Sequence, residues 1–375
     1  MSGRLLRLVC TAAVAAGVVL APGPAMAVPE PEGRSVRQLL TDLQRLYREA
    51  EQASEAYNAT AEKLKEKRAE VAGIDARLTK ARLSLHDSRG VAGRLARQQY
   101  QNSSEISSYV RLLLARDPQH ALDEGHVIRQ LSQERAESVQ RLAGSEKQAD
   151  ALARQARRAL DDRLTLAERQ KKQRDGVRKR LEAVEELLAS LSAEQLGQLA
   201  ALERAGTAAA QQKFVASGAL SSERAPSEEG DAALRYAVRQ IGKPYEWGAE
   251  GPASYDCSGL TSQAWGHAGQ AIPRTSQEQW AELPRIPVGE LRPGDLVIYF
   301  PEATHVALYL GDGMVVQAPR PGAKVKVSPI AANPVLGAVR PDPGGEPVRR
   351  YTPPKLPRGA TDGSDEGYAP VTEAR

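Results

Sequence analysis

The feature that most restricts how this chain folds is an apolar stripe with alternating spacings of four and three residues. It runs from Leu39 to Leu85, and only Thr60 and Lys67 interrupt its apolar or alanine positions. A heptad pattern held over this length predicts a long helix that pairs with another helix as a coiled coil. The stripe consists of Leu39, Leu43, Leu46, Ala50, Ala53, Tyr57, Thr60, Leu64, Lys67, Val71, Ile74, Leu78, Ala81 and Leu85.

The dipeptide Asp117-Pro118 is the clearest break in this helical region, because proline forbids a continuous helix through its position. A second helical stretch with a weaker stripe follows over residues 122–214. We therefore assign residues 35–215 to an antiparallel coiled-coil hairpin with its tip near residues 100–125. Pairing with a second copy is the alternative for so long a heptad.

The N-terminus predicts export from the cytoplasm. Residues 1–27 combine a basic start with an apolar run and end in Ala25-Met26-Ala27, the pattern of a cleaved signal peptide. A retained anchor is the competing interpretation, but the apolar run is short for a spanning helix, which needs about 20 residues. We expect cleavage near Ala27 and a secreted or cell-wall-associated protein.

Composition divides the rest of the chain. Residues 216–230 are typical of a linker, residues 231–340 hold all three tryptophans, and residues 341–375 are rich in Pro, Gly and charge. We expect a catalytic domain at 231–340 and a disordered tail at 341–375. The net charge is only +4, with both signs interspersed, so we expect no nucleic-acid partner.

Cys257 is the one cysteine expected to remain after Cys10 leaves with the signal segment. An unpaired cysteine in an exported protein predicts a reactive thiol or an intermolecular bridge; a small buried hydrophobe is the alternative. Residues 260–268 predict a short helix, and Asp256 and Ser258 suit its first turn. The positive end of the helix dipole then favours the thiolate of Cys257.

A predicted β-hairpin supplies a histidine and an amide. Strands are expected at residues 304–310 and 314–318, joined by Gly311-Asp312-Gly313. Folding about Gly311 places His305 opposite Gln317, about 5 Å apart. A cysteine hydrolase needs a thiol, an imidazole and an orienting polar group. The candidate catalytic residues are Cys257, His305 and Gln317, although Gln317 is also compatible with an ordinary strand position.

Four motifs in this region resemble the NlpC/P60 family of bacterial cell-wall peptidases, over roughly residues 231–340. They are Gly242-Lys243-Pro244-Tyr245-Glu246-Trp247-Gly248, Asp256-Cys257-Ser258-Gly259-Leu260, Arg292-Pro293-Gly294-Asp295-Leu296 and Thr304-His305-Val306-Ala307. The family most often has His where this chain has Gln317. The resemblance implies a papain-like core. The expected fold is therefore an α+β papain-like C-terminal domain preceded by a long all-α antiparallel coiled-coil hairpin.

The resemblance also implies a substrate, the stem peptide of peptidoglycan, cut between D-glutamate and the diamino acid that follows it. By the same resemblance Tyr245, Asp256 and Ser258 hold the free amine of the peptide's L-Ala. Asp256 has a competing role as a helix cap, and Ser258 as a plain helix residue. Arg274 suits either a substrate carboxylate or an ordinary surface position.

Two other functions remain open from the sequence. One is an amidase of the related CHAP type that cuts the muramoyl–L-Ala bond, and the other is a non-catalytic wall-associated activator or scaffold. Exported hydrolases of the PcsB and RipA types also carry long N-terminal coiled coils, which implies a rod that engages a membrane or divisome regulator or covers the active site. No Cys/His cluster has zinc-ligand spacing and no Gly-rich phosphate loop is present, so we expect no metal and no cofactor.

Overall fold

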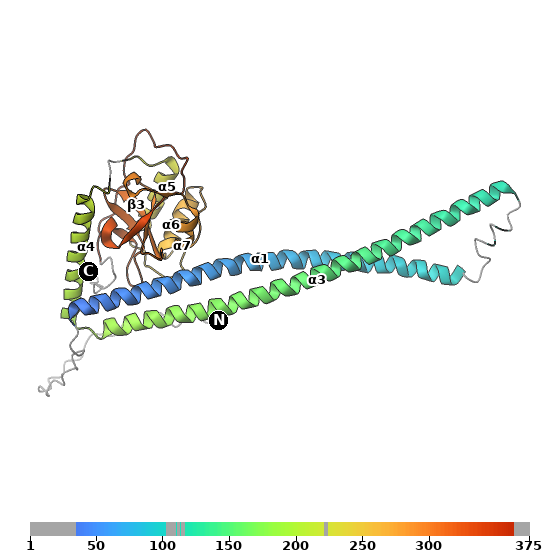
Figure 1. Cartoon of the computed structure of the whole chain (residues 1–375), viewed down its shortest axis with the longest axis horizontal. Coiled ribbons are helices and arrows are strands. Elements are labelled where there is room, and N and C mark those ends of the chain that lie inside the picture. Colours follow the sequence, from blue (N-terminus) through green and yellow to red (C-terminus); the bar gives the residue numbers. More distant parts are fainter. Residues whose placement is uncertain (1–34, 103–109, 111–112, 114–116, 221–223, 364–375) are drawn as a thin grey trace, which may run out of the picture.

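The computed structural model describes residues 35–102, 110, 113, 117–220 and 224–363. The predicted signal segment, residues 1–27, lies outside these residues. The described chain forms a long helical hairpin with a sheet domain seated against one end of it (Figure 1). The expected fold class is confirmed. No helix among the described residues is both long and apolar enough to cross a membrane.

Two helices form the hairpin. Helix α1 spans Val36–Asn102 and helix α3 spans Pro118–Ala189, with 67 and 72 residues. At 1.5 Å per residue each is about 100 Å long. They run antiparallel along each other (Figure 1). The proline suits the start of α3, where its missing N–H is not needed, and the Asp117 side chain caps that start by accepting from the His120 N–H.

The predicted stripe of α1 forms the seam of the hairpin. At the end near the sheet domain, Leu39 and Leu43 are buried against Val184 of α3, Leu191 of the turn that follows α3, and Leu199 of the next helix. Farther along, Val71 and Ile74 pack on Ala159. Beyond them, large side chains such as Leu83 (62% exposed) and Val139 (64% exposed) face solvent. The seam is therefore thickest where the sheet domain sits.

The second half of the hairpin is broken where the sequence predicted one continuous helix to residue 214. Helix α3 ends at Ala189, and helix α4 (Ala193–Ala216) starts at a capping box in which Ser192 and Gln195 bond each other's backbone N–H. Such a box satisfies the free donors of a helix start and so favours a new helix at this point. Helix α4 crosses to the sheet domain, where Gln211 bonds Gly313 O and Ala331 N.

The C-terminal domain is built on one antiparallel sheet of six strands in the order β1-β6-β2-β3-β4-β5. The strands are β1 (Arg285–Ile286), β2 (Leu296–Tyr299), β3 (His305–Gly311), β4 (Met314–Gln317), β5 (Lys326–Pro329) and β6 (Val335–Val339). Its helices are α5 (Glu228–Val238), α6 (Cys257–His267) and α7 (Ser276–Glu282), with short 3-10 turns at Val288–Glu290 and Ile330–Ala332.

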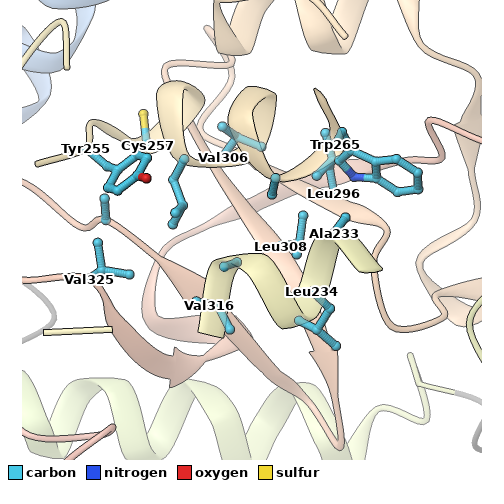
Figure 2. Close-up of a cluster of buried hydrophobic side chains, with 14 of the residues drawn as sticks. Ala233, Leu234, Tyr255, Cys257, Trp265, Leu296, Val306, Leu308, Val316 and Val325 are labelled. Carbon is cyan, nitrogen blue, oxygen red and sulfur yellow. The ribbon is translucent and has the colours of Figure 1, made fainter. Parts of the chain in front are cut away.

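Helices α5 and α6 cover one face of this sheet. Their apolar sides pack on inward residues of β2, β3 and β4, and Figure 2 shows Cys257 at the start of α6, at the edge of this core. Phe214 and Leu220 pack against the opposite face of the sheet. Burying both faces makes the sheet a rigid platform for side chains at its edges.

The motif Arg292-Pro293-Gly294-Asp295-Leu296 has a structural role in this core. Gly294 has φ +101°, and a Cβ there would come within 2.6 Å of the Gly230 backbone. The Asp295 carboxylate accepts from the Arg292 N–H and from the Arg340 guanidinium. The motif therefore joins the start of α5 to the central strand β2.

Two expected boundaries differ from the structure. Helix α5 already starts at Glu228, inside the predicted linker 216–230, because Ser227 caps it by accepting from the Gly230 N–H. Residues 341–363 of the predicted disordered tail lie against the domain: Arg292 bonds Gly345 O, Val327 N bonds Ala360 O, and Ala360 is buried. Few apolar side chains predicted disorder here, but backbone hydrogen bonds hold this segment.

Candidate active site

The candidate nucleophile, Cys257, is the first residue of α6. Asp256 caps this helix by accepting from the Gly259 N–H at 2.6 Å. Gly259 is required because a Cβ there would lie 2.2 Å from Ala249 O in the loop that crosses the helix start. The thiol accepts a hydrogen bond from the Val306 N–H, directly after His305, and Cys257 is only 3% exposed. Strand β3 thus presents the backbone beside His305 to the sulfur.

The candidate base, His305, is the first residue of β3 and bonds Gln317 at the end of β4, with 2.7 Å between Nε2 and Oε1. The predicted direct opposition is wrong: Leu308 pairs with Val316, so the register sets Gln317 diagonally to His305. A long side chain spans that diagonal. Because an amide oxygen only accepts, Nε2 carries the proton and Nδ1 has the free lone pair.

The electrostatics of the covered site oppose a thiolate. Burial raises the pKa of the Cys257 thiol well above its ordinary value, and nearby carboxylates, Glu55 first, add to the rise. Burial also lowers the pKa of His305 from 6.5 to about 4. The expectation that the helix start lowers the thiol pKa is therefore wrong for this arrangement, because desolvation outweighs the dipole. As it stands, the pair is a neutral thiol and a neutral imidazole.

The three candidate substrate-binding residues lie together at this site. Ser258 directly follows the nucleophile and Asp256 directly precedes it, and both are fully buried. Burial raises the pKa of Tyr245, with Cys257 and Asp256 the next largest influences, which places its ring beside them. Asp256 serves as the predicted cap and also accepts from the Gly248 N–H at 2.9 Å.

Helix α1 supplies side chains that sequence analysis did not assign to the site. Asn58 Nδ2 donates to Asp256 at 3.0 Å, and Glu55 accepts from Ser258 Oγ at 2.9 Å. One turn earlier, Glu51 Oε1 lies 3.6 Å from His305 Nδ1. These three polar side chains, which we call the α1 polar face, are all buried. Helix α1 therefore covers the candidate active site.

Two aromatic or cationic contacts flank this cover. The ring of Tyr57 meets Trp247 edge-on, with centroids 5.0 Å apart, and Arg320 lies over the ring of Tyr47, 4.7 Å from its centroid. The cover therefore extends over about three helical turns of α1.

Arg274 lies inside the site and not on the surface. Its side chain is 8% exposed, and its guanidinium donates to both Asp256 oxygens, at 3.0 and 2.7 Å, and to Ser258 Oγ at 2.9 Å. A further bond reaches Glu250 at 2.9 Å. Arg274 therefore fixes the two residues that flank the nucleophile.

The sequence analysis did not predict that the α1 polar face and Ser276 belong to the site, for two different reasons. Glu51, Glu55 and Asn58 recur at helical spacing beside the apolar stripe, but charged residues in a coiled coil ordinarily mark a solvated face. Ser276, whose N–H and Oγ bond Glu55 at 2.7 and 2.9 Å, starts helix α7, and seven residues are too few to show a helical period. No cluster of metal-ligating side chains occurs among the described residues.

Comparison with known proteins assigns part of the C-terminal domain to a family. The NlpC/P60 family matches residues 242–337. A probable endopeptidase of Corynebacterium glutamicum is 45% identical over 101 residues, which cover 27% of this chain and 48% of that protein. A probable endopeptidase of Mycobacterium tuberculosis is 36% identical over 110 residues, 29% of each chain. The chain spans less than half the length of these relatives.

Solved structures are also similar to part of this chain. The NlpC/P60 domain of the peptidoglycan hydrolase SagA is 33% identical and covers 30% of this chain and 97% of that one, with a TM-score of 0.28. RipD of Mycobacterium tuberculosis, titled a non-catalytic NlpC/P60 protein adapted to peptidoglycan binding, is 31% identical over 31% of this chain and 98% of that chain, also with a TM-score of 0.28. The family match at residues 242–337 identifies an NlpC/P60 domain in the C-terminal part of this chain, which follows a long helical hairpin.

Proposed function

We propose that this protein is an exported peptidoglycan hydrolase, a cysteine endopeptidase that cuts stem peptides between D-glutamate and the diamino acid. The observation that carries this is the arrangement of His305. Its Nε2 is fixed on Gln317, and the thiol of Cys257 is bonded to the next backbone N–H. Relatives described as probable endopeptidases support the peptidase activity.

In the proposed reaction, His305 Nδ1 takes the proton of the Cys257 thiol and the sulfur attacks the γ-carbonyl carbon of D-glutamate. The imidazolium then returns its proton to the leaving amine, which departs with the rest of the stem. A water molecule, deprotonated by the same nitrogen, hydrolyses the thioester and releases the carboxylate. Gln317 holds the ring throughout but, being neutral, adds no charge stabilisation.

The α1 polar face supports the assignment of the amine site. Asn58 Nδ2 donates to Asp256 where, in the proposed complex, the L-Ala ammonium would donate. Tyr245 and Ser258 complete this site. A carboxylate beside two hydroxyls suits an ammonium group, because charged hydrogen bonds are the strong ones.

The hairpin in this proposal is a regulatory cover. While α1 is in place, the thiol is 3% exposed and its pKa is raised, so the nucleophile is neither accessible nor ionised. Withdrawal of α1 restores water to the site, which removes the desolvation that raises the thiol pKa. A membrane or divisome regulator that pulls on the hairpin is the proposed partner.

Digestion of defined peptidoglycan fragments tests the function. The chain from residue 28 onward would be compared with Cys257→Ala, each with and without Glu55→Ala and Asn58→Ala to loosen the cover, and products would be read by mass spectrometry. We expect free stem peptides, whose L-Ala amine can bind Asp256, to be cut so that L-Ala-D-Glu is released, and we expect a loss of at least about 1,000-fold in the Cys257→Ala chains.

Other products would contradict the proposal. Release of the whole stem from muramic acid would indicate the CHAP-like amidase. No cleavage by either loosened or covered chains, with retained binding to peptidoglycan, would indicate a non-catalytic wall-binding protein.

A further inference from the structure

The contacts of helix α1 give a direction along the candidate active site. Asn58 contacts Asp256 at the proposed amine site, and Glu51, two helical turns earlier, lies 3.6 Å from His305. The two positions are about 10 Å apart along the helix axis. The L-Ala ammonium and the γ-carbonyl of D-glutamate are separated by a similar distance in an extended stem peptide. The residues of α1 before Glu51 therefore lie over the side of the site where the leaving amine of the proposed reaction departs.

Arg320 lies on this leaving-group side. Its guanidinium is placed over the ring of Tyr47, 4.7 Å from the centroid, and Tyr47 precedes Glu51 by one helical turn, about 6 Å. The Arg320 side chain is buried. Burial lowers the pKa of His305, and the positive charge of Arg320 adds to this effect, which places the guanidinium in the neighbourhood of the imidazole. A buried cation therefore lies beyond the candidate base, on the side away from the amine site.

The loop that follows β4 restricts the position of Arg320. Pro319 and Pro321 flank it in the sequence, and a proline restricts both its own φ and the backbone of the residue before it. The Arg320 carbonyl also accepts from the Ala323 N–H at 3.0 Å. The loop starts directly after Gln317, the last residue of β4, which bonds His305. The segment that carries the guanidinium is therefore short, restricted and anchored at the residue that orients the base.

An aromatic ring lies near the same turn of α1. The guanidinium of Arg48 lies over the ring of Phe300, 5.5 Å from its centroid, and Phe300 directly follows β2. Its φ of +61° is in the left-handed region, which a bulky residue rarely adopts. Two hydrogen bonds hold this backbone, from the Phe300 N–H to Pro334 O and from the Ala303 N–H to Phe300 O. The leaving-group side therefore offers an apolar ring as well as a cation.

We propose that Arg320 binds a carboxylate of the diamino acid that leaves, once α1 has been withdrawn, and that the methylene groups of this diamino acid pack on Phe300. This inference rests on the proposed function. A planar guanidinium can pair with a carboxylate through two parallel hydrogen bonds. Withdrawal of α1 takes Tyr47 off the guanidinium and opens this position to the substrate.

The subsite determines which leaving groups are preferred. A diamino acid carries an α-carboxylate where it ends the stem, and a second carboxylate at the end of its side chain where it is a dicarboxylic acid such as diaminopimelic acid. Either carboxylate can supply the negative charge. A carboxamide or a lysine side chain cannot form the charged pair, and hydrogen bonds between charged groups are about twice as strong as neutral ones. The enzyme therefore prefers a leaving group that carries a carboxylate within reach of Arg320.

Calorimetric binding tests the subsite without depending on catalysis. The chain from residue 28 onward, carrying Cys257→Ala and loosened by Glu55→Ala and Asn58→Ala, would be titrated with three peptides that share L-Ala-γ-D-Glu. Their third residue is lysine amide, with no carboxylate, free lysine, with only the α-carboxylate, or diaminopimelic acid α-amide, with only the side-chain carboxylate. We expect one or both carboxylate peptides to bind at least about tenfold more tightly than the lysine amide peptide. The peptide that gains affinity identifies the carboxylate.

Variants of Arg320 then assign the gain to its guanidinium. Arg320→Gln should remove most of the advantage of the carboxylate peptide, and Arg320→Lys should retain part of it, because lysine keeps the charge without the planar fork. The matched control is Arg239→Gln. Arg239 also lies over a tyrosine ring, 5.8 Å from the centroid of Tyr236, but it is exposed and outside the site. The advantage should remain unchanged in this control.

Equal affinity for the three peptides, binding of none of them, or an advantage that Arg320→Gln leaves unchanged would overturn the proposal. The comparison of the three peptides uses the chain with Arg320 intact, so it does not depend on the folding of any Arg320 variant. Failure of the proposed function is separately visible, because it appears as an absence of cleavage in chains that keep Cys257, whereas the subsite is measured in chains without the thiol.

Discussion

The two faces of α1 differ in what they bury and in what they control. One face carries the apolar stripe and packs Leu39 and Leu43 against α3 and α4. The other carries Glu51, Glu55 and Asn58 into the NlpC/P60 domain. Apolar packing stabilises the hairpin with many different apolar partners, whereas each polar contact needs a specific hydrogen-bond partner.

In the proposed function, one helix serves both as a scaffold and as a releasable cover. The burial of a carboxylate costs desolvation that its hydrogen bonds only partly offset, and burial raises the pKa of Glu55 to about 7. The polar contacts therefore add specificity more than strength. Such a cover can be withdrawn at low cost while the hairpin itself remains paired.

Loss of apolar packing should give the largest effect. Leu43 is fully buried, and Leu43→Ala should lower the free energy of unfolding of the hairpin by about 2–5 kcal/mol, because it removes buried methyl groups and leaves a cavity. Thermal melting followed by circular dichroism measures this. Leu83→Ala, at a side chain 62% exposed, is the matched control and should melt nearly as the wild type does. Equal melting of both variants would contradict the packing described for the seam.

Loss of the α1 polar face should uncover the thiol without melting the hairpin. Glu55→Ala with Asn58→Ala removes the contacts to Ser258, Ser276 and Asp256. We expect the rate of thiol labelling at Cys257 to rise about tenfold or more, which corresponds to about 1.4 kcal/mol. Alanine is the best helix former, so the helix content should stay.

The control for this variant is Glu49→Ala, because Glu49 pairs with Arg45 on the exposed side of α1. A labelling rate that is the same in the control and in the double variant would show that α1 does not gate the thiol.

The pH should act on the cover through Glu55 and His305, whose effects on closure have opposite signs. When α1 covers the site, burial raises the pKa of Glu55 from 4.5 to about 7. Protonated Glu55 therefore favours the covered state at low pH. This contribution is lost as the pH rises toward 7. Closing lowers the pKa of His305 from 6.5 to about 4, so its contribution to closure is present above pH 6.5 and is lost as the pH falls toward 4. Each group changes the free energy of closure by about 3 kcal/mol over its pH range. Between pH 4.5 and 6.5 the two changes have opposite signs and largely cancel.

Removing the titration of Glu55 should make the effect of His305 on closure measurable. In Glu55→Gln, the cover should loosen as the pH falls from 6.5 to 4, because the titration of His305 is then no longer opposed by that of Glu55. Asp256, Arg274 and Glu51 face these groups and remain in the variant. Hydrogen exchange of residues 48–58, corrected for the intrinsic rate at each pH, measures this. A wild-type chain that opens as steeply as Glu55→Gln over this range would contradict the compensation.

The apolar half of this molecule could be predicted from sequence and the polar half could not. The stripe, the break at Asp117-Pro118 and the strands around His305 follow from periodicity and turn residues, which act locally. The order of motifs also led to the NlpC/P60 resemblance over roughly residues 231–340, and the family match at residues 242–337 confirms the family. These features depend on neighbours within a few residues.

The cover depends on contacts between residues about 200 positions apart. Glu55 meets Ser258 and Ser276 only after the turn at Ser190–Ser192 and helix α4 have carried the domain back onto α1. A buried glutamate has no mark of its own in a sequence, since most glutamates in a coiled coil are solvated. The direction of the thiol pKa shift was missed for the same reason, because it follows from that burial.

The smallest effect should come from polar contacts of the same two helices that remain in water. Arg89 of α1 and Glu146 of α3 form an ion pair of 2.8 Å, with side chains 60% and 55% exposed. Because solvent screens it, Glu146→Ala should change the free energy of unfolding by less than about 1 kcal/mol and leave Cys257 labelling unchanged. Comparing Glu146→Ala with the Glu55 and Asn58 substitutions tests the effect of burial alone, because both sets of contacts are polar and both involve α1. A labelling rate raised as much by Glu146→Ala as by the double variant would mean that the cover responds to the pairing of the whole hairpin, and not to the contacts inside the site.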